Sequence, residues 1–155
     1  KACDYILENI DLGKARFYNE YNYGSYLLYR NIPVFIDSRA DLYTPEFNGK
    51  KGENGKYIGR DIFTDFLNIS SLASSYENKF SEYNITHIIT YSNSKLNSII
   101  AKDSNYKQLY DDGSFTIYER LSADINQEND NEGLNNEKNK VFNINYTINY
   151  NWSSN

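Results

Sequence analysis

The sequence lacks, or nearly lacks, several residue types on which common sites and folds depend. It contains no methionine, one cysteine (Cys3), one histidine (His87), one tryptophan and two prolines. A single cysteine excludes a disulfide within the chain. A multi-histidine metal site or a serine-type triad would need more than this one histidine, which lies inside a predicted strand. His87 is therefore interpreted as a packing residue, Cys3 is assigned no chemistry, and the sequence predicts no metal site and no cofactor.

Long apolar runs are also absent. No stretch approaches the roughly 20 apolar residues that a membrane-spanning helix requires, and no signal-peptide pattern is present. Because methionine is missing even at position 1, we expect the chain to be a piece of a longer protein.

Tyrosine and asparagine are abundant instead, with 16 tyrosines among 155 residues. Tyrosine can build a core while keeping a polar tip, so the mean hydropathy of −0.75 understates the capacity for burial. The length suits one domain with a sizeable core. A net charge of −5 and scattered lysines and arginines argue against binding to nucleic acid.

Helices and strands alternate in the first part of the chain. The pattern predicts a helix in residues 2–10, a strand at 15–18, a helix at 23–29 and a buried strand at 33–37. Gly24 lies in the first turn of the second helix, where a missing side chain allows close packing.

A long loop is predicted for residues 38–60, which contain four glycines and one proline. Loops of this length in compact domains are usually functional or disordered. The segment 50–56 is expected to be mobile.

The alternation then continues to residue 121. Asp61 is a predicted N-cap for a helix that runs to about residue 83, with a point of interruption at 68–71. A β-branched strand at 86–91 precedes a helix that ends near residue 102.

Asp112 and Gly113 lie between two alternating apolar runs, which is the clearest hairpin signal in the chain. The order of elements predicts an α/β fold with three layers. Its sheet would be mainly parallel, with helices on both faces and a C-terminal antiparallel hairpin that closes it.

The composition changes after residue 121. Residues 122–140 are rich in asparagine and glutamate and are predicted to be a flexible linker. Residues 142–152 alternate strictly between apolar and polar, which predicts an amphipathic strand within a tail at 141–155. That strand could join the edge of the domain's own sheet, pair with a second copy, or bind another partner.

The polar cluster after the strand at 33–37 is the leading candidate site. Asp37, Arg39, Asp41 and Tyr43 follow a predicted parallel strand, and ligands of open α/β sheets bind beyond such strand ends. Arg39 could hold a carboxylate or phosphate through two hydrogen bonds. The alternative interpretation is an internal ion-pair network that anchors the long loop.

Ser92, Asn93 and Ser94 form a second candidate site between a strand and a helix. Their backbone N–H groups could bind an anion. The alternative is simple capping of the helix that follows.

Three segments give the chain a resemblance to a known bacterial arrangement: NEYNYGSYLLYR, PVFIDSRADLY and YKQLYDDGSFTIYER. In order and spacing they resemble the C-terminal extracytoplasmic domain of polytopic membrane proteins related to polyprenyl-phosphate-dependent glycosyltransferases, the protein O-mannosyltransferase-like superfamily. The resemblance spans about residues 15–120. Ser38 departs from the pattern, which has glycine there. The matching positions are Gly24, Tyr26, Leu27, 34–37, Arg39, 41–43, Asp112, Gly113, Tyr118 and Arg120.

The resemblance implies a domain on the extracytoplasmic side of the cell membrane. Its partners would be the membrane-embedded remainder of its own chain and a glycan or lipid-linked sugar. The catalytic acidic residue of such enzymes lies in a region that has no counterpart here, so no catalytic residue is carried over. The alternative hypothesis is an interaction module that associates through the strand at 142–152.

Overall fold

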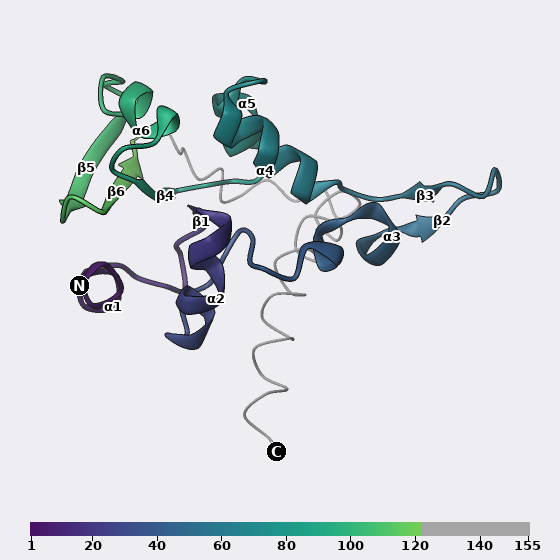
Figure 1. The fold of residues 1–155 in the computed structure, drawn as a ribbon, viewed down its shortest axis with the longest axis horizontal. Helices are drawn as coiled ribbons and strands as arrows, with labels where there is room; N and C mark the ends of the chain where they lie inside the picture. Colours follow the sequence, from purple (N-terminus) through teal and green to yellow (C-terminus); the bar gives the residue numbers. More distant parts are fainter. Residues whose placement is uncertain (122–155) are drawn as a thin grey trace, which may run out of the picture.

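The computed structural model describes residues 1–121, which form a mixed α/β fold (Figure 1). The predicted linker at 122–140 and the predicted tail at 141–155 lie outside the described residues. The elements, in chain order, are α1 (Ala2–Asn9), β1 (Phe17–Asn19), α2 (Tyr21–Tyr29), the 3-10 helix η1 (Ala40–Tyr43), α3 (Pro45–Asn48), β2 (Lys50–Lys51), β3 (Tyr57–Ile58), α4 (Ile62–Ser71), α5 (Tyr76–Glu82), β4 (His87–Tyr91), α6 (Lys95–Ile100), β5 (Tyr106–Asp111) and β6 (Phe115–Arg120).

The main sheet is mixed and has four strands in the order β1-β4-β6-β5. Only β1 and β4 pair in parallel, with Phe17 opposite His87 and Asn19 opposite Ile89. The β4–β6 and β5–β6 pairings are antiparallel. The prediction of a mainly parallel sheet is therefore wrong, because the segment expected to supply a further parallel strand does not become one.

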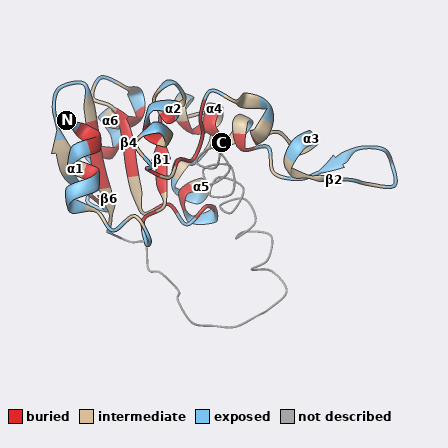
Figure 2. Ribbon diagram, turned by 90° about the horizontal axis from the view of Figure 1, so that it is seen from below, coloured by how far each residue is buried: buried red, intermediate tan, exposed pale blue. Residues whose placement is uncertain are grey.

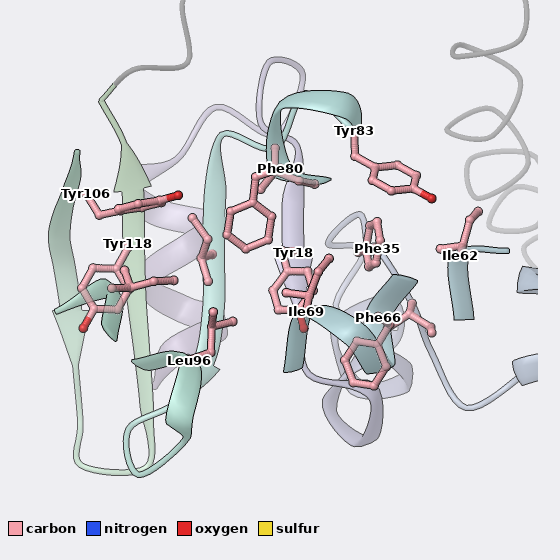
Figure 3. Close-up of a cluster of buried hydrophobic side chains, with 14 of the residues drawn as sticks. Tyr18, Phe35, Ile62, Phe66, Ile69, Phe80, Tyr83, Leu96, Tyr106 and Tyr118 are labelled. Atoms are coloured by element: carbon pink, nitrogen blue, oxygen red, sulfur yellow. The ribbon is translucent and has the colours of Figure 1, made fainter. Parts of the chain in front are cut away.

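Successive strand residues point to opposite faces of this sheet, and each face has its own hydrophobic cluster. Phe17 and Ile89 pack in a cluster with residues of α1 and α2. Tyr18 and Ile88 pack in the other cluster with residues of α4, α5 and α6 (Figure 3). Burial is concentrated along β1 and β4, as Figure 2 shows.

Tyrosine supplies much of this core, as predicted. The buried tyrosines are Tyr18, Tyr43, Tyr83, Tyr106 and Tyr118. Tyr18 has the rings of Phe35, Phe66 and Phe80 around it, with centroids 5.1–6.0 Å away.

Residues 33–37 are not a strand, although 34–37 are buried, which corrects the prediction for this segment. The Asn19 side chain makes hydrogen bonds that a paired strand would make. Its Oδ1 accepts from the Phe35 N–H at 2.7 Å, and its Nδ2 donates to the Ile36 carbonyl at 2.8 Å. A side chain bonded in this way satisfies the local backbone without a continuous ladder.

Gly24 allows α2 to lie directly against this segment, as the sequence predicted. A Cβ at position 24 would lie 2.0 Å from the Ile36 carbonyl oxygen and 2.7 Å from the Asp37 Cα. Only glycine fits there without moving the helix.

Two helices end at an asparagine in the left-handed conformation. Asn31 after α2 has φ 58°, and Asn84 after α5 has φ 52°. In each case the next N–H bonds back to a carbonyl in the last turn: Ile32 to Leu27 at 2.9 Å and Ile85 to Phe80 at 2.8 Å. This is the Schellman ending, in which asparagine tolerates positive φ better than most residues.

The region 61–83 forms two helices rather than one. Asp61 caps α4 as predicted, since its side chain accepts from the Thr64 N–H at 2.9 Å. Near the other end, the Ser70 and Ser71 hydroxyls donate to the Leu67 carbonyl, and Leu72 takes φ 60°. Hydroxyls that compete for backbone carbonyls weaken a helix, which accounts for the break.

The long segment 38–60 contains η1, α3, β2 and β3, so the prediction of an irregular loop is wrong for much of it. None of the helices formed by residues 1–121 has the length and apolar content that crossing a membrane requires.

Candidate functional site

The carboxyl ends of β1 and β4 lie side by side because these strands are parallel neighbours. The residues that follow them, Glu20 after β1 and 92–94 after β4, therefore gather at one edge of the sheet. Asn19 links this edge to the end of the extended segment 33–37. Both predicted sites lie in this part of the molecule.

Asp37 is fully buried and bonded to donors from the residues just after it. Its Oδ1 accepts from the backbone N–H and the Nε of Arg39, at 2.8 and 2.9 Å. Its Oδ2 pairs with Nη2 of Arg39 and accepts from the Tyr43 hydroxyl at 2.8 Å. The carboxylate is therefore used within the protein, as the interpretation of a loop anchor requires.

The groups in this cluster favour an ionised Asp37 and a protonated Tyr43. Burial acts to raise the pKa of Asp37, but hydrogen bonds from Arg39 and Tyr43 outweigh it and lower the pKa below its usual value. Burial and the neighbouring Asp37 charge raise the pKa of Tyr43. Asp37 is thus ionised and Tyr43 is a proton donor at neutral pH.

The structure brings Asp37, Arg39 and Tyr43 together but leaves Asp41 outside the cluster. Asp41 is exposed, and within residues 1–121 its carboxylate makes no hydrogen bond or ion pair. Arg39 keeps part of its side chain at the surface, with 38% exposed. Its Nε and Nη2 are bonded to Asp37, so Nη1 is the guanidinium nitrogen left for an external anion.

Ser92 and Ser94 act mainly as caps and connectors. The Ser94 side chain accepts from the Asn97 N–H at 3.0 Å, which makes it the N-cap of α6. Ser92 donates to Asp111 at 3.0 Å, and Asn93 is exposed. Helix α6 is short, and the Ser94 side chain already bonds to its first turn. The capping interpretation therefore fits this segment better than an anion site.

Glu20 is a buried carboxyl at the same edge that was not among the predicted site residues. Its Oε1 accepts from the Thr90 hydroxyl at 2.8 Å and from the Tyr91 N–H at 3.4 Å. Burial raises the pKa of Glu20, although these hydrogen bonds oppose the shift. The position of Glu20 directly after β1 could have indicated a site residue. Thr90 was also missed, because its closeness to Glu20 depends on the pairing of β1 with β4.

Tyr18 lies two positions before Glu20 and is fully buried. Its hydroxyl is one of the buried polar atoms in residues 1–121 that have no hydrogen-bond partner. Burial and the charge of Glu20 raise the pKa of Tyr18 well above its usual value.

The side chains of Cys3 and His87 both pack against other side chains, as interpreted for His87. Cys3 is buried, and its Sγ lies 3.1 Å from the Tyr23 hydroxyl. The His87 ring stacks at a tilt on Phe17, 5.5 Å between centroids, and burial lowers its pKa. No group of three or more histidine, cysteine, aspartate or glutamate side chains in the described part of the chain is placed to hold a metal ion.

Comparison of the chain with protein-family models, with curated proteins and with solved structures gives no match.

Proposed function

We propose that the chain is a non-catalytic support domain on the extracytoplasmic side of a membrane protein that resembles lipid-linked-sugar glycosyltransferases. The observation that carries the support role is the saturated Asp37 carboxylate, which Arg39 and Tyr43 occupy from within the same segment. This network anchors the long segment 38–60 to the body of the domain. The resemblance of the three segments in residues 15–120 supports the membrane context.

Recognition of a ligand is a second role for the same cluster. The partial exposure of the Arg39 side chain supports it, since guanidinium hydrogens that do not bond to Asp37 can bind the phosphate of a lipid-linked sugar. In this role, Arg39 would act on the lipid carrier while the membrane-embedded remainder of the chain performs the chemistry.

The coding sequence that flanks these residues provides the test. We expect it to encode several apolar segments of about 20 residues, each long enough to span a bilayer. A parent gene without such segments would contradict the proposal.

The alternative function is an interaction module that associates through residues 142–152, which lie outside the described residues. The strict apolar–polar alternation of that segment supports it. It predicts concentration-dependent association that is lost when the chain is truncated at residue 140. Analytical ultracentrifugation that finds both proteins monomeric at all concentrations would exclude it.

We also propose that the fold is a three-layer arrangement closed by the β5–β6 hairpin. Support comes from the two hydrophobic clusters that include residues on opposite faces of β1 and β4, and from the antiparallel pairing of β5 with β6. An experimental structure that placed α1 and α2 on the same face as α4 would contradict it.

A further inference from the structure

A short arm, residues 47–59, projects from the body of the domain. It contains β2 and β3, which pair antiparallel with Lys50 opposite Ile58 and Lys51 opposite Tyr57. Both overall views show β2 reaching well beyond the main sheet (Figures 1 and 2). The arm is therefore the part of residues 1–121 best placed to meet another surface first.

The base of the arm has a defined construction. Asn48 Nδ2 donates to the Arg60 carbonyl at 2.7 Å, and Asn48 Oδ1 accepts from the Arg60 N–H at 3.1 Å. A Cβ on Gly59 would lie 2.7 Å from the Gly49 Cα, so the two backbones meet at a distance that requires glycine. Side-chain clamping and glycine contact hold the arm in place at its base.

The arm exposes three large apolar side chains, Phe47 at its base and Tyr57 and Ile58 on β3. Ile58 is 72% exposed, Phe47 57% and Tyr57 44%. Single exposed apolar residues are ordinary on a protein surface. Three on one projecting arm, none of which packs into either hydrophobic cluster, leave the arm with apolar area that only an external partner could cover.

The charge of the arm is opposite to that of the protein. The arm carries three exposed lysines (Lys50, Lys51 and Lys56) and one glutamate, whereas the chain has a net charge of −5. None of these lysines forms an ion pair within residues 1–121. The projection separates this positive charge from the acidic body. Salt screens charges over about 8 Å at physiological ionic strength, so the body does not cancel the attraction of the arm for an anionic surface.

We propose that this arm binds the surface of a bilayer that contains anionic lipids. The lysines contact the headgroups, while Tyr57 and Ile58, on the two faces of β3, enter the interfacial region as the arm inserts. Aromatic and aliphatic side chains beside lysine are the combination that such interfaces favour. A small ligand needs a pocket, whereas a bilayer surface can be bound by a projecting arm. This inference goes beyond the proposed support role and does not require a membrane-spanning segment in the parent chain.

The test is sedimentation of the whole chain with phosphatidylcholine vesicles, prepared with and without phosphatidylserine. We expect binding only to the anionic vesicles, weakened by added salt. Replacing Lys50, Lys51 and Lys56 by alanine should weaken binding about a hundredfold, since each lysine near such a surface is worth about fivefold in affinity. The matched control replaces Lys14, Lys95 and Lys102, three exposed lysines of the body, and should leave binding nearly unchanged apart from the shared change in net charge.

A second pair of variants tests the apolar contribution. Tyr57→Ser combined with Ile58→Ser should weaken binding at least about tenfold, because apolar area that enters the interface is lost. Tyr29→Ser removes a tyrosine that is 80% exposed on α2 and should have no effect. All replaced side chains are exposed, and thermal unfolding of each variant checks that the fold is retained.

Three outcomes would overturn the proposal. The first is no binding to anionic vesicles, and the second is equal loss from the arm and body lysine variants. The third is retention of the chain by immobilised polyglutamate without binding to anionic vesicles, which would assign the arm to an acidic protein partner. Each of these results is independent of the flanking coding sequence, so failure here is distinct from failure of the proposed function.

Discussion

Asn19 joins β1 to a buried segment that has no strand of its own. Its amide bonds to Phe35 and Ile36, and all of its atoms are buried. Asn19→Ala would leave at least two buried backbone groups without partners, so we expect a loss of about 3 kcal/mol in the free energy of unfolding.

Urea denaturation measures this loss, with Asn9→Ala as the control. The Asn9 side chain also bonds to a backbone carbonyl, that of Tyr5, but at an exposed position. Its replacement should change stability by less than about 0.5 kcal/mol. Equal effects of the two variants would show that the Asn19 bonds do not hold residues 33–37.

Glu20 makes stability depend on pH in a direction opposite to that of most carboxylates. Its raised pKa means that the folded state binds the proton more tightly than the unfolded chain, whose value is 4.5. The stability that Glu20 adds to the folded state is fully present below pH 4.5 and is lost as the pH rises through the raised pKa of the folded state. Glu20→Gln keeps an oxygen acceptor for Thr90 and removes the buried charge.

We therefore expect Glu20→Gln to be more stable than the parent chain at about pH 7, with the difference vanishing at about pH 4. Thermal unfolding across this range measures it. Glu8→Gln removes the same charge from an exposed position of α1 and is the matched control. A constant difference across the range would contradict a raised pKa at Glu20.

The contact between α2 and residues 36–37 depends on the absence of a side chain at Gly24. In an exposed helix, Gly→Ala stabilises by up to about 1 kcal/mol. Here the new Cβ would overlap the Ile36 carbonyl, so we expect Gly24→Ala to destabilise by about 2 kcal/mol instead.

The sign of the change is the decisive result, measured by urea denaturation. Gly13→Ala serves as the control, since its nearest contact would be an Asp11 side-chain oxygen at 3.2 Å, which can move. We expect that variant to lie within about 0.5 kcal/mol of the parent chain. Stabilisation by Gly24→Ala would mean that α2 does not lie against this backbone.

Within the described part of the chain, both hydrophobic clusters are built from residues between Ala2 and Tyr118. A chain that ends at Leu121 keeps every one of these contacts. We expect it to unfold within about 0.5 kcal/mol of the 155-residue chain in urea. A larger loss would place part of the stabilising core after residue 121.

Features set by neighbouring residues were predictable from the sequence. Asp61 and Ser94 cap their helices, and Asn84 ends one, because capping involves bonds over three or four positions. The glycine at position 24 also indicated close packing before its neighbour was known.

The candidate site was only partly predictable. Asp37, Arg39 and Tyr43 lie within seven positions and do meet, but the local pattern could not show that their bonds are mutual rather than directed outward. Glu20 could have been noted from its position after the first strand, but its partner Thr90, 70 positions away, could not.

Local patterns were thus enough to establish the α/β class, the main helices and their caps, because each depends on bonds between near neighbours in the chain. Tertiary structure decided that the sheet is mixed, that Phe35 and Ile36 bond to an asparagine side chain, and that residues 47–59 form a projecting arm. Those outcomes depend on contacts between distant segments, in which burial and hydrogen-bond satisfaction outweigh local preference.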